Sequence, residues 1–190
     1  MRLPHLFRDN PKLQALENRM IVRLARGLKG IDGNKVVFMC FRGRSYGDNP
    51  RAISERLHAL RPETDIVWLF RGGTIREMER VVPDYVRAVS VGSRRCWAEL
   101  GTARVWVDNF TKEPLLRGFP KSRQFYVQTW HGDRAVKKIC YDAFPGGYRL
   151  EEACSLVLTG SDFGQRMFRT AFNYRGEYLN EGCQIGRAHV

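Results

Sequence analysis

One histidine, His131, has the sequence surroundings that a catalytic residue needs. It directly follows the strand-like run Tyr126–Trp130 and precedes Gly132. An imidazole at the end of a strand can take a proton from a hydroxyl group, because the usual pKa of histidine is about 6.5. Gly132 carries no side chain, so the backbone or a substrate could approach closely there. The pattern predicts a general base, and a histidine held by backbone hydrogen bonds is the alternative.

Other side chains that could bind phosphate follow further predicted strands. They are Arg42, Arg44, Ser161 and Lys137, together with Gly132 beside the histidine. Guanidinium and ammonium groups pair with phosphate oxygens, and loops rich in glycine and hydroxyl groups can surround them. For the arginines and the lysine, a solvated surface position is the alternative. Asp108, at the end of another strand, is expected to cap a helix, with orientation of a base as the second interpretation.

Several familiar chemistries lack their motifs in this sequence. Neither G-x-x-x-x-G-K-[ST] nor G-x-G-x-x-G occurs, so nucleoside-triphosphate hydrolysis and the usual mode of dinucleotide binding have no support. The five cysteines are odd in number and form no C-x-x-C pair, which argues against a disulfide scaffold or a zinc ribbon and favours reduced thiols. We expect neither a metal site nor a cofactor.

The elements that must position these residues alternate between short apolar runs and amphipathic segments. Strands are predicted at Lys35–Phe41, Asp65–Phe70, Tyr85–Val91, Arg104–Val107, Phe125–Trp130 and Ser155–Leu158. Helices are predicted from Asn49 as N-cap, from Thr74 through Glu79, after Ser93, over Arg134–Cys140 and over Asp162–Phe172. This alternation predicts an α/β fold, a parallel sheet with helices on both faces. Ligands of such sheets bind beyond the carboxyl ends of the strands, where the candidate residues fall.

The length, hydrophobic content and net charge of the chain indicate its general class. The 190 residues suit about one domain, and 43% hydrophobic residues are enough for a core. The net charge of +12 indicates an anionic partner, such as a phosphate-bearing substrate, an acidic membrane surface or a nucleic acid. No apolar run approaches the ~18 residues of a membrane span, and the N-terminus does not resemble a secretory signal.

The two ends of the chain are set apart from residues 34–183. Residues 1–33 contain a predicted helix over Pro11–Lys29 with an apolar stripe and a separate basic face. The stripe consists of Leu13, Leu16, Met20, Leu24 and Leu28, and the basic face of Lys12, Arg19, Arg23 and Arg26. We expect the stripe to pack on the domain, since Glu17 intrudes on the apolar side; a helix lying on an anionic membrane is the alternative. Residues 184–190 resemble the translation of a sequencing adapter and are interpreted as a foreign tail.

The run Gln128–Gly132, followed by Lys137 and Lys138, resembles the N-terminal half of the CDP-glycerol glycerophosphotransferase family, the teichoic acid primases and polymerases. Three further segments fit this family. They are Val36–Phe41 with its loop through Pro50, Thr159–Phe163, and Asn180–Cys183, which is similar to the start of the family's connector. The resemblance covers residues 34–183 and implies the Rossmann-like acceptor domain of a two-domain GT-B architecture, with the donor domain absent.

The resemblance also implies a reaction. His131 matches the family's proposed base, which activates an acceptor hydroxyl to attack the β-phosphorus of CDP-glycerol. The implied partners are CDP-glycerol, a lipid-linked glycerol-phosphate or teichoic acid acceptor and an anionic membrane surface, at the cytoplasmic face of the cell membrane, with no nucleic acid. In this chain Lys137 stands one position away from the family's lysine, which weakens a phosphate role for it. The fragment alone is expected to be inactive.

Two other functions remain open from sequence. One is a GT-B glycosyltransferase of cell-surface polysaccharide synthesis that uses a nucleotide-sugar donor. The other is a basic nucleic-acid-binding module without enzymatic activity, which the net charge alone suggests, although no reader motif is present. The sequence also leaves open whether the transferred group is glycerol phosphate or ribitol phosphate, and whether the parent enzyme is a primase or a polymerase.

Overall fold

The computed structural model describes residues 11–110, 123–132, 138–143 and 154–181. Its centre is a seven-stranded sheet in the order β3-β2-β1-β4-β5-β6-β7, and every neighbouring pair is parallel. The strands are β1 (Asp32–Met39), β2 (Asp65–Phe70), β3 (Val86–Ser90), β4 (Ala103–Asp108), β5 (Phe125–Gln128), β6 (Leu156–Thr159) and β7 (Glu177–Asn180). The predicted parallel sheet is confirmed.

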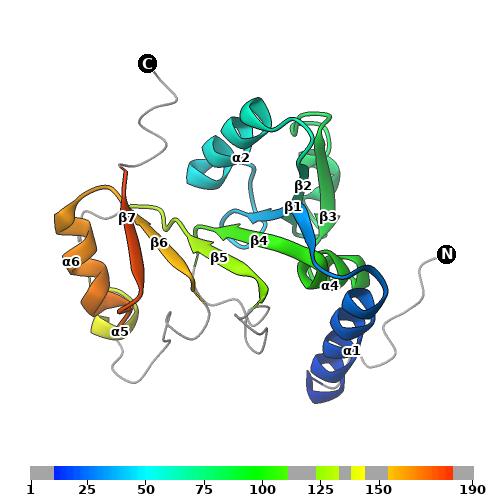
Figure 1. Ribbon diagram of the computed structural model, residues 1–190, viewed down its shortest axis with the longest axis horizontal. Coiled ribbons are helices and arrows are strands. Elements are labelled where there is room, and N and C mark those ends of the chain that lie inside the picture. The colour runs from blue at the N-terminus through cyan, green and yellow to red at the C-terminus, as the bar shows by residue number, and fades with distance from the viewer. Residues whose placement is uncertain (1–10, 111–122, 133–137, 144–153, 182–190) are drawn as a thin grey trace.

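Helices cover both faces of this sheet, as predicted (Figure 1). They are α1 (Pro11–Lys29), α2 (Asp48–Leu60), α3 (Ile75–Met78), α4 (Arg94–Thr102), α5 (Cys140–Ala143) and α6 (Asp162–Ala171). Successive strand residues point to opposite faces, so Phe38 belongs to the core cluster that includes residues of α2 and α3. Val37 belongs to the cluster on the other face, which includes residues of α1, α4 and α6. Val36–Met39 of β1 and Ile66–Phe70 of β2 are apolar at every position, as strand segments covered on both sides are expected to be.

Some element boundaries differ from the sequence prediction. β7 was not predicted, because this edge strand is mostly exposed and carries polar residues. Asn49 is not the N-cap of α2, since the helix begins at Asp48 with Gly47 in the cap position. The helix predicted over Arg134–Cys140 is wrong in its described part: residues 138 and 139 are not helical, and α5 begins at Cys140. Residues 134–137 and the tail at 184–190 lie outside the described residues.

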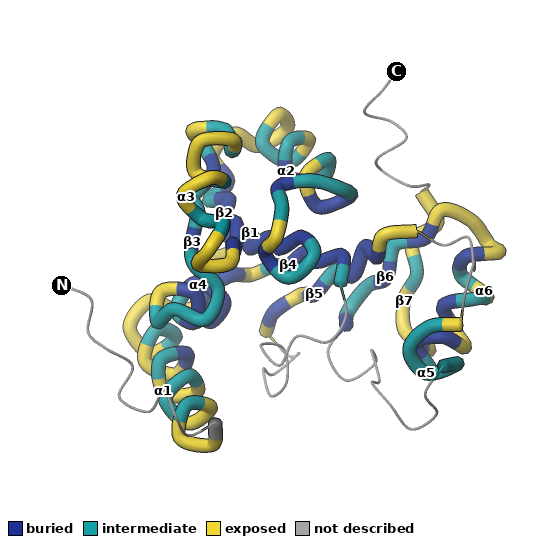
Figure 2. Tube along the Cα trace, turned by 180° about the vertical axis from the view of Figure 1, so that it is seen from behind, coloured by how far each residue is buried: buried dark blue, intermediate teal, exposed yellow. Residues whose placement is uncertain are grey.

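Helix α1 packs on α4 with the face opposite to the one expected. The five apolar residues of its stripe are 39–84% exposed, and Figure 2 shows exposed positions along the whole helix. The packed face instead places Val22 against Gly101, where an added Cβ would lie 3.2 Å from the Val22 side chain. Glu17 pairs with Arg94 at 2.7 Å, and Arg26 donates to the Gly101 carbonyl at 2.8 Å. Our prediction for the apolar stripe was therefore wrong.

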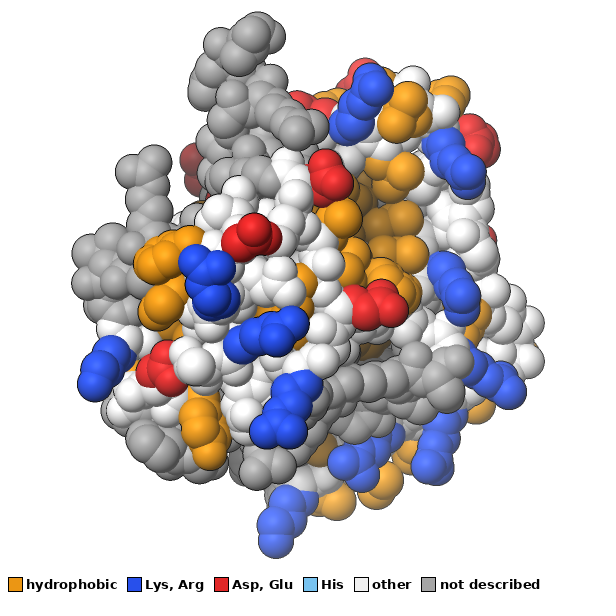
Figure 3. Space-filling model, turned by 60° about the vertical axis from the view of Figure 1, so that its left-hand side comes forward, with side chains coloured by type: hydrophobic (Ala, Val, Ile, Leu, Met, Phe, Trp, Pro, Cys, Tyr) orange, Lys and Arg blue, Asp and Glu red, His pale blue; other side chains and the backbone are white. Residues whose placement is uncertain are grey.

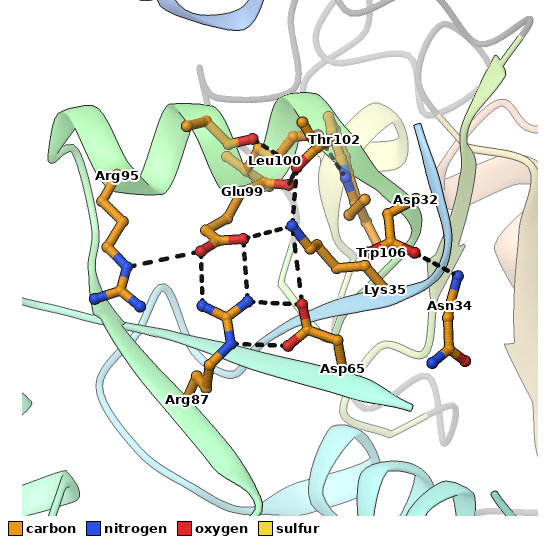
Figure 4. A network of polar contacts seen from close by, with 12 residues as sticks. Asp32, Asn34, Lys35, Asp65, Arg87, Arg95, Glu99, Leu100, Thr102 and Trp106 are labelled. Atoms are coloured by element: carbon orange, nitrogen blue, oxygen red, sulfur yellow. Dashed lines mark hydrogen bonds and ion pairs between the residues drawn. The ribbon is translucent and has the colours of Figure 1, made fainter. Parts of the chain in front are cut away.

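A network of charged side chains joins α4 to the amino-terminal halves of β1, β2 and β3 (Figure 4). Glu99 of α4 contacts Lys35 at 2.9 Å and Arg87 at 2.7 Å. Asp65 accepts two hydrogen bonds from Arg87 and lies 3.8 Å from Lys35. The network lies at the sheet edge opposite the carboxyl ends of the strands, so it supports the fold at a distance from the predicted site.

Candidate functional site

His131 lies at the carboxyl edge of the sheet, just beyond β5. The loops that follow β1 and β4 begin at the same edge. β1, β4 and β5 are neighbours in the sheet although their loops are far apart in sequence. The loop after β1 contributes Phe41, the start of α2 contributes Asp48, and the loop after β4 contributes Asn109 and Phe110. The predicted position of the histidine at this edge is confirmed.

A backbone carbonyl fixes the imidazole ring of His131. Its Nδ1 atom lies 2.7 Å from the carbonyl oxygen of Asn109. A carbonyl can only accept a hydrogen bond, so Nδ1 carries the proton and Nε2 of the neutral ring keeps its lone pair. Among the described residues no hydrogen bond to Nε2 is present, and the side chain is exposed. This is the tautomer that a general base acting through Nε2 requires.

Three aromatic rings surround the imidazole. Trp130 stacks on it with ring centroids 4.2 Å apart, Phe110 lies nearly parallel at 5.6 Å, and Phe41 is tilted at 5.2 Å. The guanidinium of Arg42 lies 4.8 Å from the centroid of the Phe110 ring. The three rings restrict rotation of the imidazole, and the Phe110 ring lies between the imidazole and the positive charge of Arg42.

The loop that carries His131 is held by buried polar side chains. Gln128 is fully buried; it accepts a hydrogen bond from the Trp130 N–H at 2.8 Å and donates to the Tyr126 hydroxyl at 2.8 Å. The backbone N–H of Thr129 donates to the Asp108 carbonyl at 2.9 Å. Asn49, from the start of α2, donates to the carbonyls of Thr129 and Trp130 at 3.4 and 3.3 Å. The segment that carries the histidine is therefore held by hydrogen bonds to residues of β4, β5 and α2.

The side chain of Asn109 connects the loops after β1 and β4. It is fully buried, accepts from the Phe41 N–H at 2.8 Å and donates to the Asp48 carboxylate at 2.5 Å. It also lies 3.5 Å from the Cys40 sulfur. Burial raises the pKa of the Cys40 thiol to about 11, and nearby Asp48 contributes in the same direction, so this cysteine stays protonated and is a poor nucleophile.

Backbone strain is concentrated at the same edge. Of the six described non-glycine residues with positive φ, four lie here: Phe41, Arg42, Asp48 and Trp130, with φ between 44° and 59°. Each such residue costs of order 1–3 kcal/mol and persists only where its surroundings hold it. Strain of this kind accumulates at sites where side chains must be aimed in a defined direction.

The other predicted site residues are only partly brought together. Gly132 has φ 132°, and no atom lies within 4 Å of the position that a Cβ would take, so a ligand has room there. Arg42 is near the imidazole through Phe110, whereas Arg44 is exposed in the turn that follows. Ser161 caps α6 by accepting from the Gly164 N–H at 3.1 Å. Lys137 lies outside the described residues, so its role stays a prediction.

Asp108 does not cap a helix, contrary to our expectation. It is 3% exposed, and its side chain accepts from the Phe110 N–H at 3.1 Å, which closes a turn at the end of β4. The residues that sequence reasoning missed as parts of the site are Asp48, Asn49, Asn109, Phe110 and Gln128. For the last three the available signal was their position at or just after the carboxyl end of a strand, whereas Asp48 and Asn49 begin α2. Contacts between side chains of different loops leave no local periodicity in the sequence.

A cavity of about 630 Å³ lies elsewhere, between α5 and the end of α6. Its lining includes Arg169, Arg175 and Asp142. α6 runs back from the carboxyl end of β6, so its last turn lies at the amino edge of the sheet and the cavity is separate from His131. No cluster of residues able to hold a metal ion is present in the described ranges.

Comparison with known proteins shows the family of this chain. Residues 20–183 match the family described as CDP-Glycerol:Poly(glycerophosphate) glycerophosphotransferase. The chain belongs to this family. The matched region of this glycerophosphotransferase-family chain includes His131 and all of the residues that hold it.

Teichoic acid enzymes are among the relatives of this glycerophosphotransferase-family chain. The teichoic acid poly(glycerol phosphate) polymerase of Staphylococcus epidermidis is 32% identical over 56% of the chain and 14% of its own length. That of Bacillus subtilis strain 168 is 26% identical over 90% of the chain and 25% of its own length. The teichoic acid glycerol-phosphate transferase of Staphylococcus aureus is 28% identical over 78% of the chain and 40% of its own length. The chain thus spans less than half the length of each.

A solved structure shows the same fold. The wall teichoic acid polymerase TagF superposes with a TM-score of 0.76 at 22% sequence identity, over 94% of this chain and 46% of that one. This likeness confirms the Rossmann-like α/β fold that was expected for one half of a GT-B architecture.

Proposed function

We propose that this chain is the acceptor-side domain of a CDP-glycerol glycerophosphotransferase of teichoic acid synthesis, with His131 as its general base. The observation that carries the proposal is the 2.7 Å contact between Nδ1 of His131 and the Asn109 carbonyl. This contact leaves Nε2 able to accept a proton at the sheet edge where such folds bind ligands. Family membership supports the reaction class.

In the proposed step, Nε2 takes the proton of a glycerol hydroxyl at the end of the acceptor. The hydroxyl oxygen forms a bond to the β-phosphorus of CDP-glycerol, and the bridging P–O bond breaks. CMP leaves with the bonding electron pair, and a phosphodiester remains on the acceptor. The imidazolium then releases its proton to solvent. Such a transfer depends on positioning, on the base and on positive charge near the phosphates.

The proposed partners are anionic, and the charge of the chain suits them. The net charge is +12, and on the face shown in Figure 3 Lys and Arg side chains outnumber Asp and Glu side chains. Arg42, near the imidazole, is the described residue best placed to meet a phosphate of the acceptor. CDP-glycerol is proposed to bind a separate donor domain beyond residues 34–183, so the 190-residue chain alone should release no CMP from it.

We further propose that residues 1–33 attach the enzyme to the cytoplasmic face of an anionic membrane. No helix in the described parts of the chain is long and apolar enough to cross a bilayer. However, α1 exposes its apolar stripe, and Arg19 and Arg23 are also exposed on this helix. An exposed apolar stripe with a basic flank is the pattern of a helix that lies in the membrane interface. Arg26 belongs to the packed face and is not part of this surface.

The test of the proposed function is the His131→Ala variant of the full-length enzyme, assayed for CMP release with CDP-glycerol and acceptor. We expect turnover to fall about 10²- to 10⁴-fold, the usual contribution of a general base. The melting temperature should change little, because the ring is exposed on one side. His58→Ala is the matched control, since His58 stacks on Tyr85 at 3.6 Å, away from the site. A folded His131→Ala enzyme with near-normal turnover would refute the proposal.

A further inference from the structure

We propose that Asp48 and Asn109 act as a pair of positioning residues that orient His131 for proton transfer. The inference rests on the proposed function and adds to it the residues that set the tautomer and direction of the base. Neither residue contacts the reacting atoms in this proposal. Both act through the backbone carbonyl of Asn109, which accepts the hydrogen bond from Nδ1 of His131 at 2.7 Å.

The first step of the argument is that Asn109 is held at both ends of its amide. Its side-chain oxygen accepts from the Phe41 N–H at 2.8 Å, and its side-chain nitrogen donates to Asp48 at 2.5 Å. With 0% exposure, no water can replace either bond in the folded protein without a rearrangement of the site. The peptide plane that contacts His131 therefore cannot turn while both side-chain bonds are intact.

The second step concerns Asp48 itself. It has φ 57°, a left-handed conformation that costs free energy for any residue with a side chain. Its other carboxylate oxygen accepts from the Asn49 N–H at 2.9 Å. The carboxylate is thus used twice, once to fix the start of α2 and once to fix Asn109. A charge-assisted hydrogen bond from an amide to a carboxylate is stronger than a neutral one, which makes this anchor stiff.

The third step is that the same site fixes the opposite side of the imidazole loop. Asn49, next to Asp48, donates to the carbonyls of Thr129 and Trp130, the two residues before His131. The start of α2 thereby contacts both the side chain of Asn109, the residue whose carbonyl holds the ring, and the backbone just before His131. A displacement of about 1 Å at a reacting group can cost on the order of 100-fold in rate.

The chain offers a reciprocal exchange as the test. In Asp48→Asn two amides face each other, and in Asn109→Asp two carboxylates do, so each single variant loses a bond. In the double variant D48N/N109D all three bonds can form again. The new carboxylate at position 109 accepts from Phe41 N–H and from the new amide at position 48, whose oxygen accepts from Asn49 N–H. Asparagine also tolerates the left-handed conformation at position 48.

We expect each single variant of the full-length enzyme to lower kcat about 10- to 100-fold, with KM for the acceptor changed less than about 3-fold. The double variant should regain most of the lost kcat. In a His131→Ala background, Asp48→Asn should lower the residual rate no further, because its effect passes through the histidine. Melting temperatures separate loss of fold from loss of orientation, and the double variant keeps the test valid if Asn109→Asp alone is unstable.

Three results would overturn the inference. They are normal kcat in folded single variants, no recovery in a folded double variant, and an equal loss of rate in the presence and absence of His131. The proposed function fails differently, through a folded His131→Ala enzyme that remains active.

Discussion

Replacing Glu99 by glutamine tests whether the charge network around this residue stabilises the fold in a pH-dependent way. Glu99 is 11% exposed in its side chain and contacts Lys35 and Arg87. Burial alone would raise its pKa, but hydrogen bonds and charge from Arg87 and Lys35 lower it from 4.5 to about 2. Because the folded-state pKa is depressed, the stabilisation is present above pH 4.5 and is lost as the pH falls toward 2.

The size of the effect follows from this pKa. At ~1.36 kcal/mol per pKa unit, the lowering from 4.5 to about 2 corresponds to about 3 kcal/mol of unfolding free energy near pH 6.5. The same linkage gives a loss of about 2 kcal/mol in the wild-type protein by pH 3. Glu99→Gln should therefore be about 3 kcal/mol less stable at pH 6.5 and only about 1 kcal/mol less stable at pH 3.

Urea unfolding of the wild-type and Glu99→Gln chains at both pH values measures the difference. The matched control is Glu55→Gln, which removes an exposed pair with Arg51 on α2 and should cost about 0.5 kcal/mol or less. If the stability gap between wild type and Glu99→Gln is the same at pH 6.5 and pH 3, the carboxylate does not titrate as described. A gap no larger than that of the control would show that the network adds nothing to stability.

Three further predictions concern other parts of the chain. Gly43→Ala should cost about 1–3 kcal/mol of unfolding free energy, because φ is 78° and an added Cβ would lie 3.0 Å from two backbone atoms. The control Gly33→Ala has open space around the new Cβ and should be tolerated; equal melting temperatures of the two variants would contradict the prediction. Cys40 should resist iodoacetamide at pH 8 until the protein unfolds, because burial raises its pKa to about 11; peptide mapping of alkylated folded protein detects any failure. Arg19→Gln with Arg23→Gln should weaken binding to phosphatidylserine vesicles by about 2 kcal/mol, roughly 30-fold, in low-salt co-sedimentation; unchanged binding would exclude a membrane role for these arginines.

The sheet could be predicted from sequence because its central strands β1 and β2 contain segments that are buried on both faces. Runs such as Val36–Met39 and Ile66–Phe70 are apolar at every position, and no other local structure explains them as well. The position of His131 also followed from sequence, since it comes directly after the predicted strand Phe125–Trp130. These features depend on residues close together in the chain, where periodicity carries the information.

The face on which α1 packs could not be predicted, because periodicity identifies an apolar stripe without saying what it contacts. The packed face is fixed by the Glu17–Arg94 pair, whose members are 77 residues apart, and by the small residue Gly101 that lets Val22 approach. The Asp48–Asn109 contact was missed for the same reason. It exists because β1 and β4 are neighbours in the sheet, and that neighbourhood is a property of strand order.

The charge network and the histidine occupy opposite edges of the sheet, and this separation bears on how the domain can change over evolution. Glu99 and Arg87 secure α4 to the strands without using any residue of the loops after β1, β4 or β5. Exposed side chains of those loops, such as Arg44 and His131, can therefore change while this network stays intact. Under the proposed function, exchange of exposed side chains in these loops would change which acceptor binds, and the charge network would be left as it is.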